Sequence, residues 1–224
     1  MGIIRGYDAG AVQTKFSKAM AADGMEFVGR YLTRGSDWRT LFRPEVDEHH
    51  RNGMAVVLIF QHMNNTPGYF TLDNAKRDLE AACRRYEELK CPDRLAIHFA
   101  VDTDVIPANE KAIIAYAEYV FEHRPKVENG GWKWYLGWYG DDRTIHRLVV
   151  ERQLGELAYF ANAPGWRESS IPDTWDFLQK AQRVHPCGAQ IDDVEILEEE
   201  GQDHRSTLEH LGAWVPQIQQ GVNA

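Results

Sequence analysis

Cysteine is scarce in this sequence, and its spacing indicates neither a disulfide framework nor a metal site. The 224 residues contain three cysteines, Cys83, Cys91 and Cys187, and no CxxC or HExxH motif. Cys83 lies within a helical pattern and Cys91 just beyond it, so we interpret them as small buried apolar side chains. We expect neither a bound metal ion nor another cofactor.

Long apolar runs and an excess of positive charge are also lacking. No apolar run approaches the roughly 20 residues that a membrane span requires. The formal net charge is -9, whereas a nucleic-acid-binding surface needs concentrated basic residues. We therefore expect no membrane span and no nucleic-acid partner. Residues 1–8 contain no charged leader followed by an apolar segment, so we also expect no signal peptide and synthesis in the cytoplasm.

The sequence does contain enough apolar residues for a folded domain, arranged as alternating strand and helix patterns. Hydrophobic residues make up 43% of the chain and aromatic residues 11%. Short apolar runs predict strands, and longer stretches with a periodic apolar face predict helices. The expected strands cover 3–9, 26–32, 55–61, 95–101, 132–139, 157–163 and 187–196, and the expected helices cover 11–23, 43–52, 71–90, 109–123, 142–154 and 206–215.

This repeated β-then-α order favours an α/β fold, a (β/α)8-type TIM barrel, over an open sheet. No linker or internal repeat divides the chain, so residues 1–224 are predicted to form a single barrel domain. Roughly 200 residues is the lower limit for this barrel. We therefore expect a compact version whose ring of helices is incomplete on the weakly patterned C-terminal side.

The segment 95–104 carries the strongest chemical signal, because its apolar run ends in Asp102 and Asp104. Side chains two apart on a strand point to the same side, so these carboxylates would repel each other and raise one pKa. Such an unequal pair suits acid and base catalysis at a glycosidic bond. The alternative is a solvated, Asp-rich turn after the strand.

Polar and aromatic residues also stand at the ends of the other predicted strands. In a parallel barrel the C-terminal strand ends meet at one rim, which carries the chemistry. Aromatic rings can pack against sugar rings, and carboxylates and amides can bind hydroxyl groups. Phosphate chemistry would instead need glycine-rich loops or basic clamps. The candidate site residues are Asp8, Arg30, Tyr31, Gln61, Asp102, Asp104, Trp138, Tyr139, Asn162, Gln190 and Asp192.

Structural alternatives exist for several of these residues. Asp8 could cap the following helix, and Arg30 could serve only as an ion-pair partner of Asp8 or Asp102. Tyr31 and Tyr139 could simply pack at the rim.

Two assignments depend on strand geometry. Trp138 is the preferred sugar-stacking residue, because Trp132 and Trp134 are expected to pack together on one face of their strand. Asp192 and Asp193 are equivalent candidates, since the sequence does not determine the register of the last strand.

A series of short motifs accompanies the predicted strands. They are Gly6-Tyr7-Asp8, Phe27-Val28-Gly29-Arg30-Tyr31-Leu32, Gly53 followed by Val56 to Gln61, Phe99-Ala100-Val101-Asp102-Thr103-Asp104, Gly137-Trp138-Tyr139-Gly140 and Gln190-Ile191-Asp192. In this order the motifs resemble the glycoside-hydrolase-like domain of the DUF1906 (Rv2525c-like) family, distant relatives of the family-25 lysozymes (muramidases). The resemblance covers most of the chain and implies a barrel with a sugar-binding cleft.

The resemblance also implies roles for particular positions. In those lysozymes an Asp on the first strand, an Asp-x-Glu on the fourth and a late Asp line the cleft. Asp8, Asp102 and Asp192 match the three Asp positions, and Asp104 stands where the lysozymes have the Glu that acts as general acid. Asp is one methylene shorter than Glu, and a displacement of about 1 Å can cost on the order of a hundredfold in rate.

Two hypotheses about function follow. The first is a peptidoglycan-directed, muramidase-like glycoside hydrolase, for example a phage lysin that acts at the cell wall after release, with Asp104 as proton donor. Asp102 would stabilise positive charge or orient a 2-acetamido group, and Asp8 and Asp192 would position sugar or water. The alternative is a non-catalytic glycan-binding or virion- or cell-wall-associated structural module on the same barrel. A related acetylated polysaccharide is a further candidate ligand.

Overall fold

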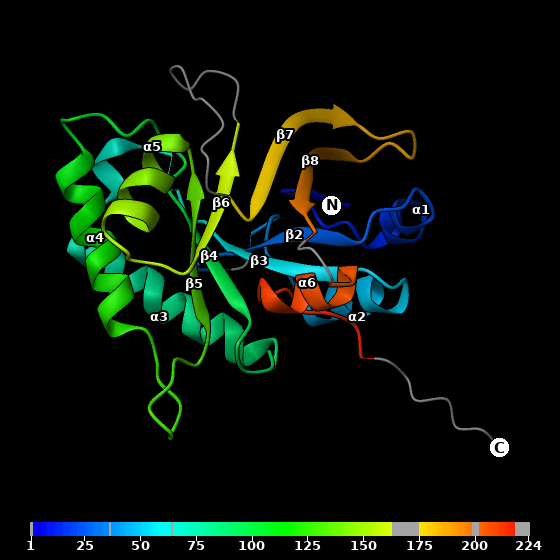
Figure 1. Ribbon diagram of the computed structural model, residues 1–224, viewed down its shortest axis with the longest axis horizontal. Coiled ribbons are helices and arrows are strands. Elements are labelled where there is room, and N and C mark those ends of the chain that lie inside the picture. The colour runs from blue at the N-terminus through cyan, green and yellow to red at the C-terminus, as the bar shows by residue number, and fades with distance from the viewer. Residues whose placement is uncertain (1, 36, 64, 163–174, 199–201, 218–224) are drawn as a thin grey trace.

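The chain folds into a closed barrel of eight strands surrounded by helices, as the computed structural model describes it for residues 2–35, 37–63, 65–162, 175–198 and 202–217 (Figure 1). The (β/α)8-type barrel predicted from the sequence is confirmed. The strands are β1 (Ile3–Asp8), β2 (Phe27–Leu32), β3 (Ala55–Phe60), β4 (Ala96–Ala100), β5 (Tyr135–Gly140), β6 (Leu157–Ala161), β7 (Phe177–Val184) and β8 (Gln190–Leu197). The helices are α1 (Ser17–Ala22), α2 (Arg43–Arg51), α3 (Leu72–Glu88), α4 (Glu110–His123), α5 (Asp142–Ile145) and α6 (His204–His210).

The last strand, β8, runs against its neighbours. Strands β1 to β7 pair in parallel, whereas β8 is antiparallel to both β7 and β1 and closes the barrel between them. Residues 185–189 form the tight turn that reverses the chain, with the His185 amide donating to the Ala189 carbonyl at 2.8 Å. Gly188 supplies the left-handed backbone that this turn needs, at φ +91°. A turn thus replaces a helix between β7 and β8, so the ring of helices is interrupted there.

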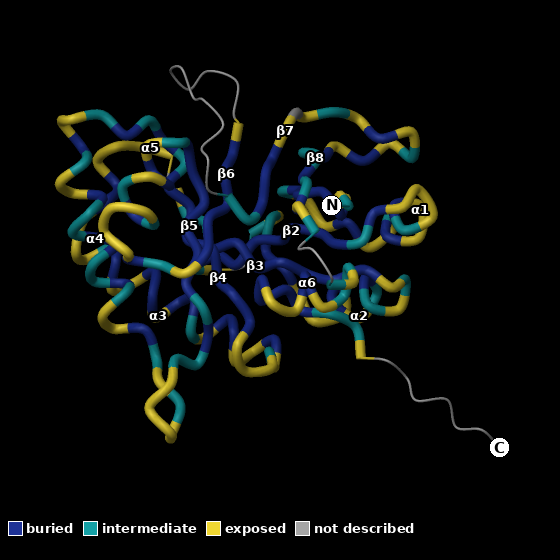
Figure 2. Tube along the Cα trace, viewed as in Figure 1, coloured by how far each residue is buried: buried dark blue, intermediate teal, exposed yellow. Residues whose placement is uncertain are grey.

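Strand alternation divides the side chains into two clusters. Inward-facing residues such as Ile59, Tyr159 and Phe177 fill the barrel interior, and outward-facing residues such as Phe60 and Phe99 belong to the larger cluster shared with the helices. Figure 2 shows β2 to β6 largely buried and the outer helix faces exposed. Every inward position is therefore followed by an outward one, which decides which strand-end residues can reach a central site.

One end of the barrel is closed by the chain around α6. Leu208, Leu211 and Ala213 join the interior cluster, and the Gly212 carbonyl accepts a hydrogen bond from the amide of Ala96, where β4 begins, at 2.8 Å. The Trp214 carbonyl likewise accepts a hydrogen bond from the amide of Val56, in β3, at 3.0 Å. The opposite end, where the parallel strands finish, is open and can hold a binding site.

Some elements differ from the sequence-based expectation. Strand β7 was not expected, because its sequence, FLQKAQRV, has too few apolar residues to give a strand pattern. The helix expected over 142–154 is shorter and ends as a π-helical turn, residues His146–Glu151. Leu154 closes this segment by donating its amide to the Leu148 carbonyl at 2.8 Å.

Candidate functional site

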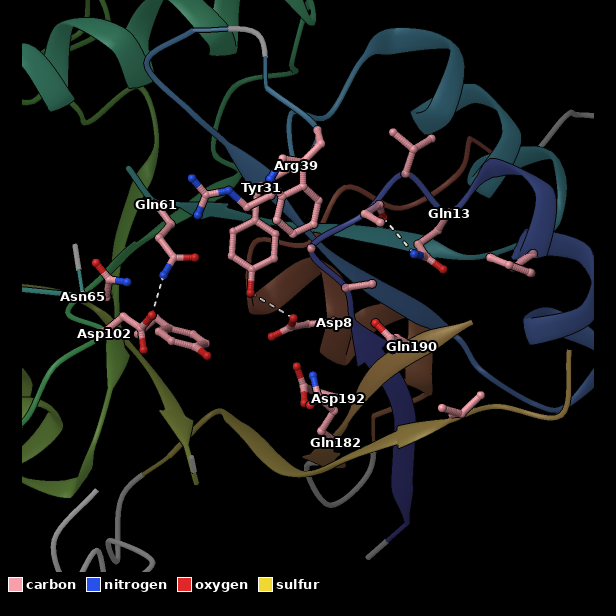
Figure 3. A pocket seen from close by; sticks show the side chains of 18 of the residues that line it. Asp8, Gln13, Tyr31, Arg39, Gln61, Asn65, Asp102, Gln182, Gln190 and Asp192 are labelled. Carbon is pink, nitrogen blue, oxygen red and sulfur yellow. Dashed lines mark hydrogen bonds between the residues drawn. The ribbon is translucent and has the colours of Figure 1, made fainter. Parts of the chain in front are cut away.

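A cavity of about 730 Å³ opens at the end of the barrel where the parallel strands finish. Figure 3 shows Asp102 on one side of this cavity and Asp8 and Asp192 on the other. The predicted site residues that line it are Asp8, Tyr31, Gln61, Asp102, Tyr139, Gln190 and Asp192. The structure thus brings these seven strand-end residues to one cavity, and β8 contributes its N-terminal rather than its C-terminal end to the rim.

Asp8, at the end of β1, is the most deeply placed of the carboxylates. It is 1% exposed. The Tyr31 hydroxyl donates to its Oδ1 at 2.9 Å, and the Tyr159 hydroxyl to its Oδ2 at 3.3 Å. Gly29 leaves the necessary space, because a Cβ there would lie 2.8 Å from the Asp8 Cβ. Asp8 is thus built into the barrel interior and does not cap a helix.

Burial raises the pKa of Asp8 to about 7, and the negative charge of Asp192 adds to the increase. The hydrogen bonds from Tyr31 and Tyr159 act in the opposite direction. A carboxyl group with such a pKa exchanges its proton near neutral pH, the property expected of a group that takes part in acid–base chemistry or in holding a polar ligand.

Asp102 follows β4 by two residues and keeps the inward direction of that strand. The Gln61 side-chain amide donates to its Oδ2 at 2.7 Å. The preceding amide, of Val101, donates to the Tyr139 carbonyl at 2.7 Å, which fixes the backbone beside the cavity. Burial raises the pKa of Asp102, although the hydrogen bond from Gln61 and the charge of Arg39 oppose the change.

Asp192 faces the cavity from β8, directly opposite Asp8 in the strand register. Burial raises its pKa, and a hydrogen bond from Gln179 lowers it. Asp193 lies outside the cavity lining and pairs with Arg183, whose Nη2 is 2.9 Å from its Oδ1. The choice between Asp192 and Asp193 that the sequence leaves open is resolved in favour of Asp192.

Arg30 does not reach the cavity, so its predicted place among the substrate-binding residues is wrong. Tyr31 points inward from β2, and alternation turns Arg30 outward. Its side chain is fully buried beside Glu45 of α2, with Nε 2.8 Å from Oε1. The remaining donors bind the carbonyl groups of Ala9, Gly10 and Arg39. The predicted ion pair with Asp8 or Asp102 does not form; the pair is with Glu45.

Trp138 is not the sugar-stacking residue that the sequence analysis expects. It is fully buried between the barrel and the helices, and its Nε1 donates to the Leu154 carbonyl at 2.8 Å. Its ring lies beside those of Phe99 and Tyr116. Tyr139, the next residue along β5, is the inward-facing one, so alternation again explains the error.

Asp104 and Asn162 are not among the described residues that line the cavity. Asp104 is half-buried in the segment after β4, where the Asn109 side chain donates to its backbone carbonyl at 2.8 Å. Strand β4 ends at Ala100, so strand alternation no longer governs the direction of Asp104. Asn162 is exposed and stands directly before residues 163–174, which lie outside the described part of the chain.

Several residues of the site were missed by the sequence analysis. Tyr159 is an inward position of β6, and its alternation with Phe160 was a usable signal. Gln182 lines the cavity from β7, where it pairs with Asp192 after a register shift. Trp38 and Arg39 come from the loop after β2, and loop residues carry no periodic pattern from which their direction could be predicted.

Within the described ranges, no group of three His, Cys, Asp or Glu side chains could hold a metal ion. No helix in the same ranges has the length and apolar character needed to cross a membrane.

The structure is a closed α/β barrel with three acidic side chains around the cavity at its open end, and its family model places it among glycoside-hydrolase-like domains. The chain belongs to the Rv2525c-like, glycoside hydrolase-like domain family, whose model matches residues 18–208. A curated relative, the uncharacterized protein FadG of Bacillus subtilis (strain 168), is 26% identical over 173 residues. That match covers 73% of this chain but 29% of the relative, so the chain spans less than a third of that protein.

Solved structures share the fold at low sequence identity. The Tat-secreted protein Rv2525c of Mycobacterium tuberculosis, in complex with L-tartrate, superposes with a TM-score of 0.71 at 17% identity, covering 96% of this chain and 99% of that one. The catalytic domain of endolysin ply40, from bacteriophage P40 of Listeria monocytogenes, gives a TM-score of 0.57 at 12% identity, with coverage of 94% and 98%.

Proposed function

We propose that this protein is a peptidoglycan-directed glycoside hydrolase of the muramidase type. The observation that carries most weight is the placement of Asp8, Asp102 and Asp192 around one cavity, each with a raised pKa. Cleavage of a glycosidic bond needs a protonated carboxyl group beside the leaving oxygen and a second group that stabilises positive charge or guides water. Family membership and the fold shared with an endolysin catalytic domain give further support.

The proton donor is assigned within the pair Asp102 and Asp104. The resemblance to lysozymes implies Asp104, whereas the cavity favours Asp102, because Asp102 lines it and has a pKa raised by burial. In our proposal Asp102 protonates the leaving oxygen, with Gln61 orienting the carboxyl group. Asp8 and Asp192, on the opposite side, position sugar or water.

The test is digestion of purified peptidoglycan, followed by measurement of new reducing ends and by mass spectrometry of the products. Asp102→Asn is expected to lower the rate by about a hundredfold or more, while Asp193→Asn, the matched control outside the cavity, keeps the wild-type rate. Loss of activity in Asp104→Asn with retention in Asp102→Asn would transfer the donor role to Asp104. The hydrolase proposal is abandoned if the wild-type protein releases no reducing ends.

The setting we propose is the bacterial cell wall, as in a phage lysin that reaches its substrate after release. Support comes from the fold shared with the endolysin domain and with a Tat-secreted protein. Related acetylated polysaccharides are tested in the same assay by substituting chitin oligomers for peptidoglycan.

A non-catalytic glycan-binding module is the second candidate. It is favoured by one observation: Asp104, the residue at the general-acid position of the resemblance, does not line the cavity. Co-sedimentation with insoluble peptidoglycan, measured alongside reducing ends, distinguishes the two functions. Binding without any new reducing ends identifies the module.

A further inference from the structure

Several exposed apolar side chains line the cavity. The described chain has nine exposed large hydrophobic residues, and four of them line this one cavity. They are Val12, Trp38, Met63 and Val184, with exposed fractions of 45%, 68%, 63% and 65%. Isolated exposed apolar residues need no explanation, but several that line one cavity indicate a binding surface.

Trp38 is the largest of these four residues, and the backbone on either side of it is held by hydrogen bonds. The buried Arg30 donates to the carbonyl of the next residue, Arg39, at 3.1 Å. The Arg39 amide donates to Asp37 Oδ1 at 2.8 Å, and the Thr40 amide to the Asp37 carbonyl at 3.1 Å. An exposed indole on a fixed backbone loses little conformational freedom when a ligand binds.

The loop after β1 supports the ring from the side of the barrel. Gly10 lies against the indole, because a Cβ at Gly10 would be 3.1 Å from two ring carbons. The Gly10 carbonyl accepts from Arg30 at 3.2 Å. Arg30 therefore ties together the two loops, one that carries Trp38 and one on which the ring rests.

We propose that Trp38 is the aromatic platform of a sugar subsite, on which the apolar face of an N-acetylated pyranose ring stacks. The subsite is continuous with the cavity that holds Asp8 and Asp102, so it would hold a ring of the same glycan chain. Val12, Met63 and Val184 line the same cavity and add exposed apolar surface to it. This inference rests on the proposed function, since it names the part of the cavity that holds a neighbouring sugar.

The experiment uses peptide-free glycan strands prepared from peptidoglycan as the probe, with binding followed by calorimetry and tryptophan fluorescence. Trp38→Ala is expected to raise the Kd by about tenfold, and Trp38→Phe, which keeps a ring, by only a few-fold. Strand binding should shield the wild-type fluorescence from acrylamide quenching, and Trp38→Phe should lose this shielding. Trp132→Phe, a half-buried tryptophan outside the cavity lining, is the matched control and should behave as wild type.

Failure of the subsite and failure of the hydrolase give different results. Strands that bind, with a weakened Kd in Trp38→Ala and no reducing ends, support the subsite and remove the hydrolase. Cleavage with an unchanged Kd and KM in Trp38→Ala overturns the subsite and leaves the hydrolase intact. Absence of strand binding by the wild-type protein also overturns the subsite.

Discussion

Asp8 and Asp192 lie directly opposite each other in the antiparallel pairing of β1 with β8. Both side chains face the cavity, and the described ion pairs include neither of them. Two carboxylates so placed cannot both ionise freely, which is why the charge of Asp192 adds to burial in raising the pKa of Asp8 to about 7. The reversed direction of β8 thus has a chemical consequence, since it sets a second acid against the first.

The raised pKa predicts how stability depends on pH. Folded Asp8 keeps its proton up to about pH 7, whereas in the unfolded chain its pKa returns to the ordinary value of 3.8. The folded state therefore binds more protons between these values, and the free energy of unfolding contributed by Asp8 falls as pH rises through this window. The loss is at most about 4 kcal/mol.

Asp8→Asn should remove that contribution. Urea unfolding between pH 4 and pH 8 is expected to show a smaller decline for the variant than for the wild-type protein, and the variant should be the more stable above pH 7. Asp193→Asn, which leaves the inner carboxylates in place, is the control and should follow the wild-type curve. Parallel curves for Asp8→Asn and wild type would contradict an elevated pKa at Asp8.

A second prediction concerns the buried pair of Arg30 and Glu45. Arg30→Met leaves the buried Glu45 carboxylate without its arginine partner and frees the carbonyl groups that Arg30 binds. We expect a loss of about 3–5 kcal/mol in the free energy of unfolding. The double variant Arg30→Met, Glu45→Gln should recover part of that loss, because it also removes the buried carboxylate charge. Urea denaturation of the wild-type protein, the two single variants and the double variant gives the coupling energy between Arg30 and Glu45. Strictly additive losses would show that the two residues act independently.

The sequence predicts the barrel and most of its acidic mouth, but it leaves side-chain direction uncertain at the strand ends. Asp8 and Gln61 are correctly placed because each continues an inward row of its strand. Arg30 and Trp138 were assigned to the site although each is adjacent to a tyrosine that already occupies the inward position. Strand alternation lets only one residue of each adjacent pair face inward, and the structure shows that it is the tyrosine.

Other features could not be predicted from local patterns. The direction of β8 depends on the turn at 185–189, which a single glycine, Gly188, marks only weakly. Trp38 belongs to a loop whose course is set by the distant Arg30, so no spacing rule places it at the cavity. Long-range pairing decides both cases, and a local sequence window does not contain it.

The barrel interior also predicts an effect at Gly137. This glycine of β5 leaves space for the buried His98 ring, and a Cβ there would overlap ring atoms of His98. Gly137→Ala should therefore destabilise the fold by about 1–3 kcal/mol through overpacking. Gly68→Ala is the matched control, since nothing lies within 4 Å of a Cβ at that position. Thermal unfolding of the two variants is the measurement, and equal melting temperatures would refute the steric argument.

The last prediction separates the two tryptophans that sequence and structure propose for sugar stacking. Trp138→Phe removes a buried hydrogen bond to Leu154 and part of a packed ring, so it should lower the free energy of unfolding by about 1–3 kcal/mol. Because Trp138 faces away from the cavity, the Trp138→Phe variant should bind glycan strands as the wild-type protein does. Trp38→Ala should show the reverse, with weaker binding and a stability within about 0.5 kcal/mol of wild type, since its side chain is 68% exposed. Measuring both properties for both variants tests strand direction and subsite together, and weakened binding in Trp138→Phe at full stability would return the stacking role to Trp138.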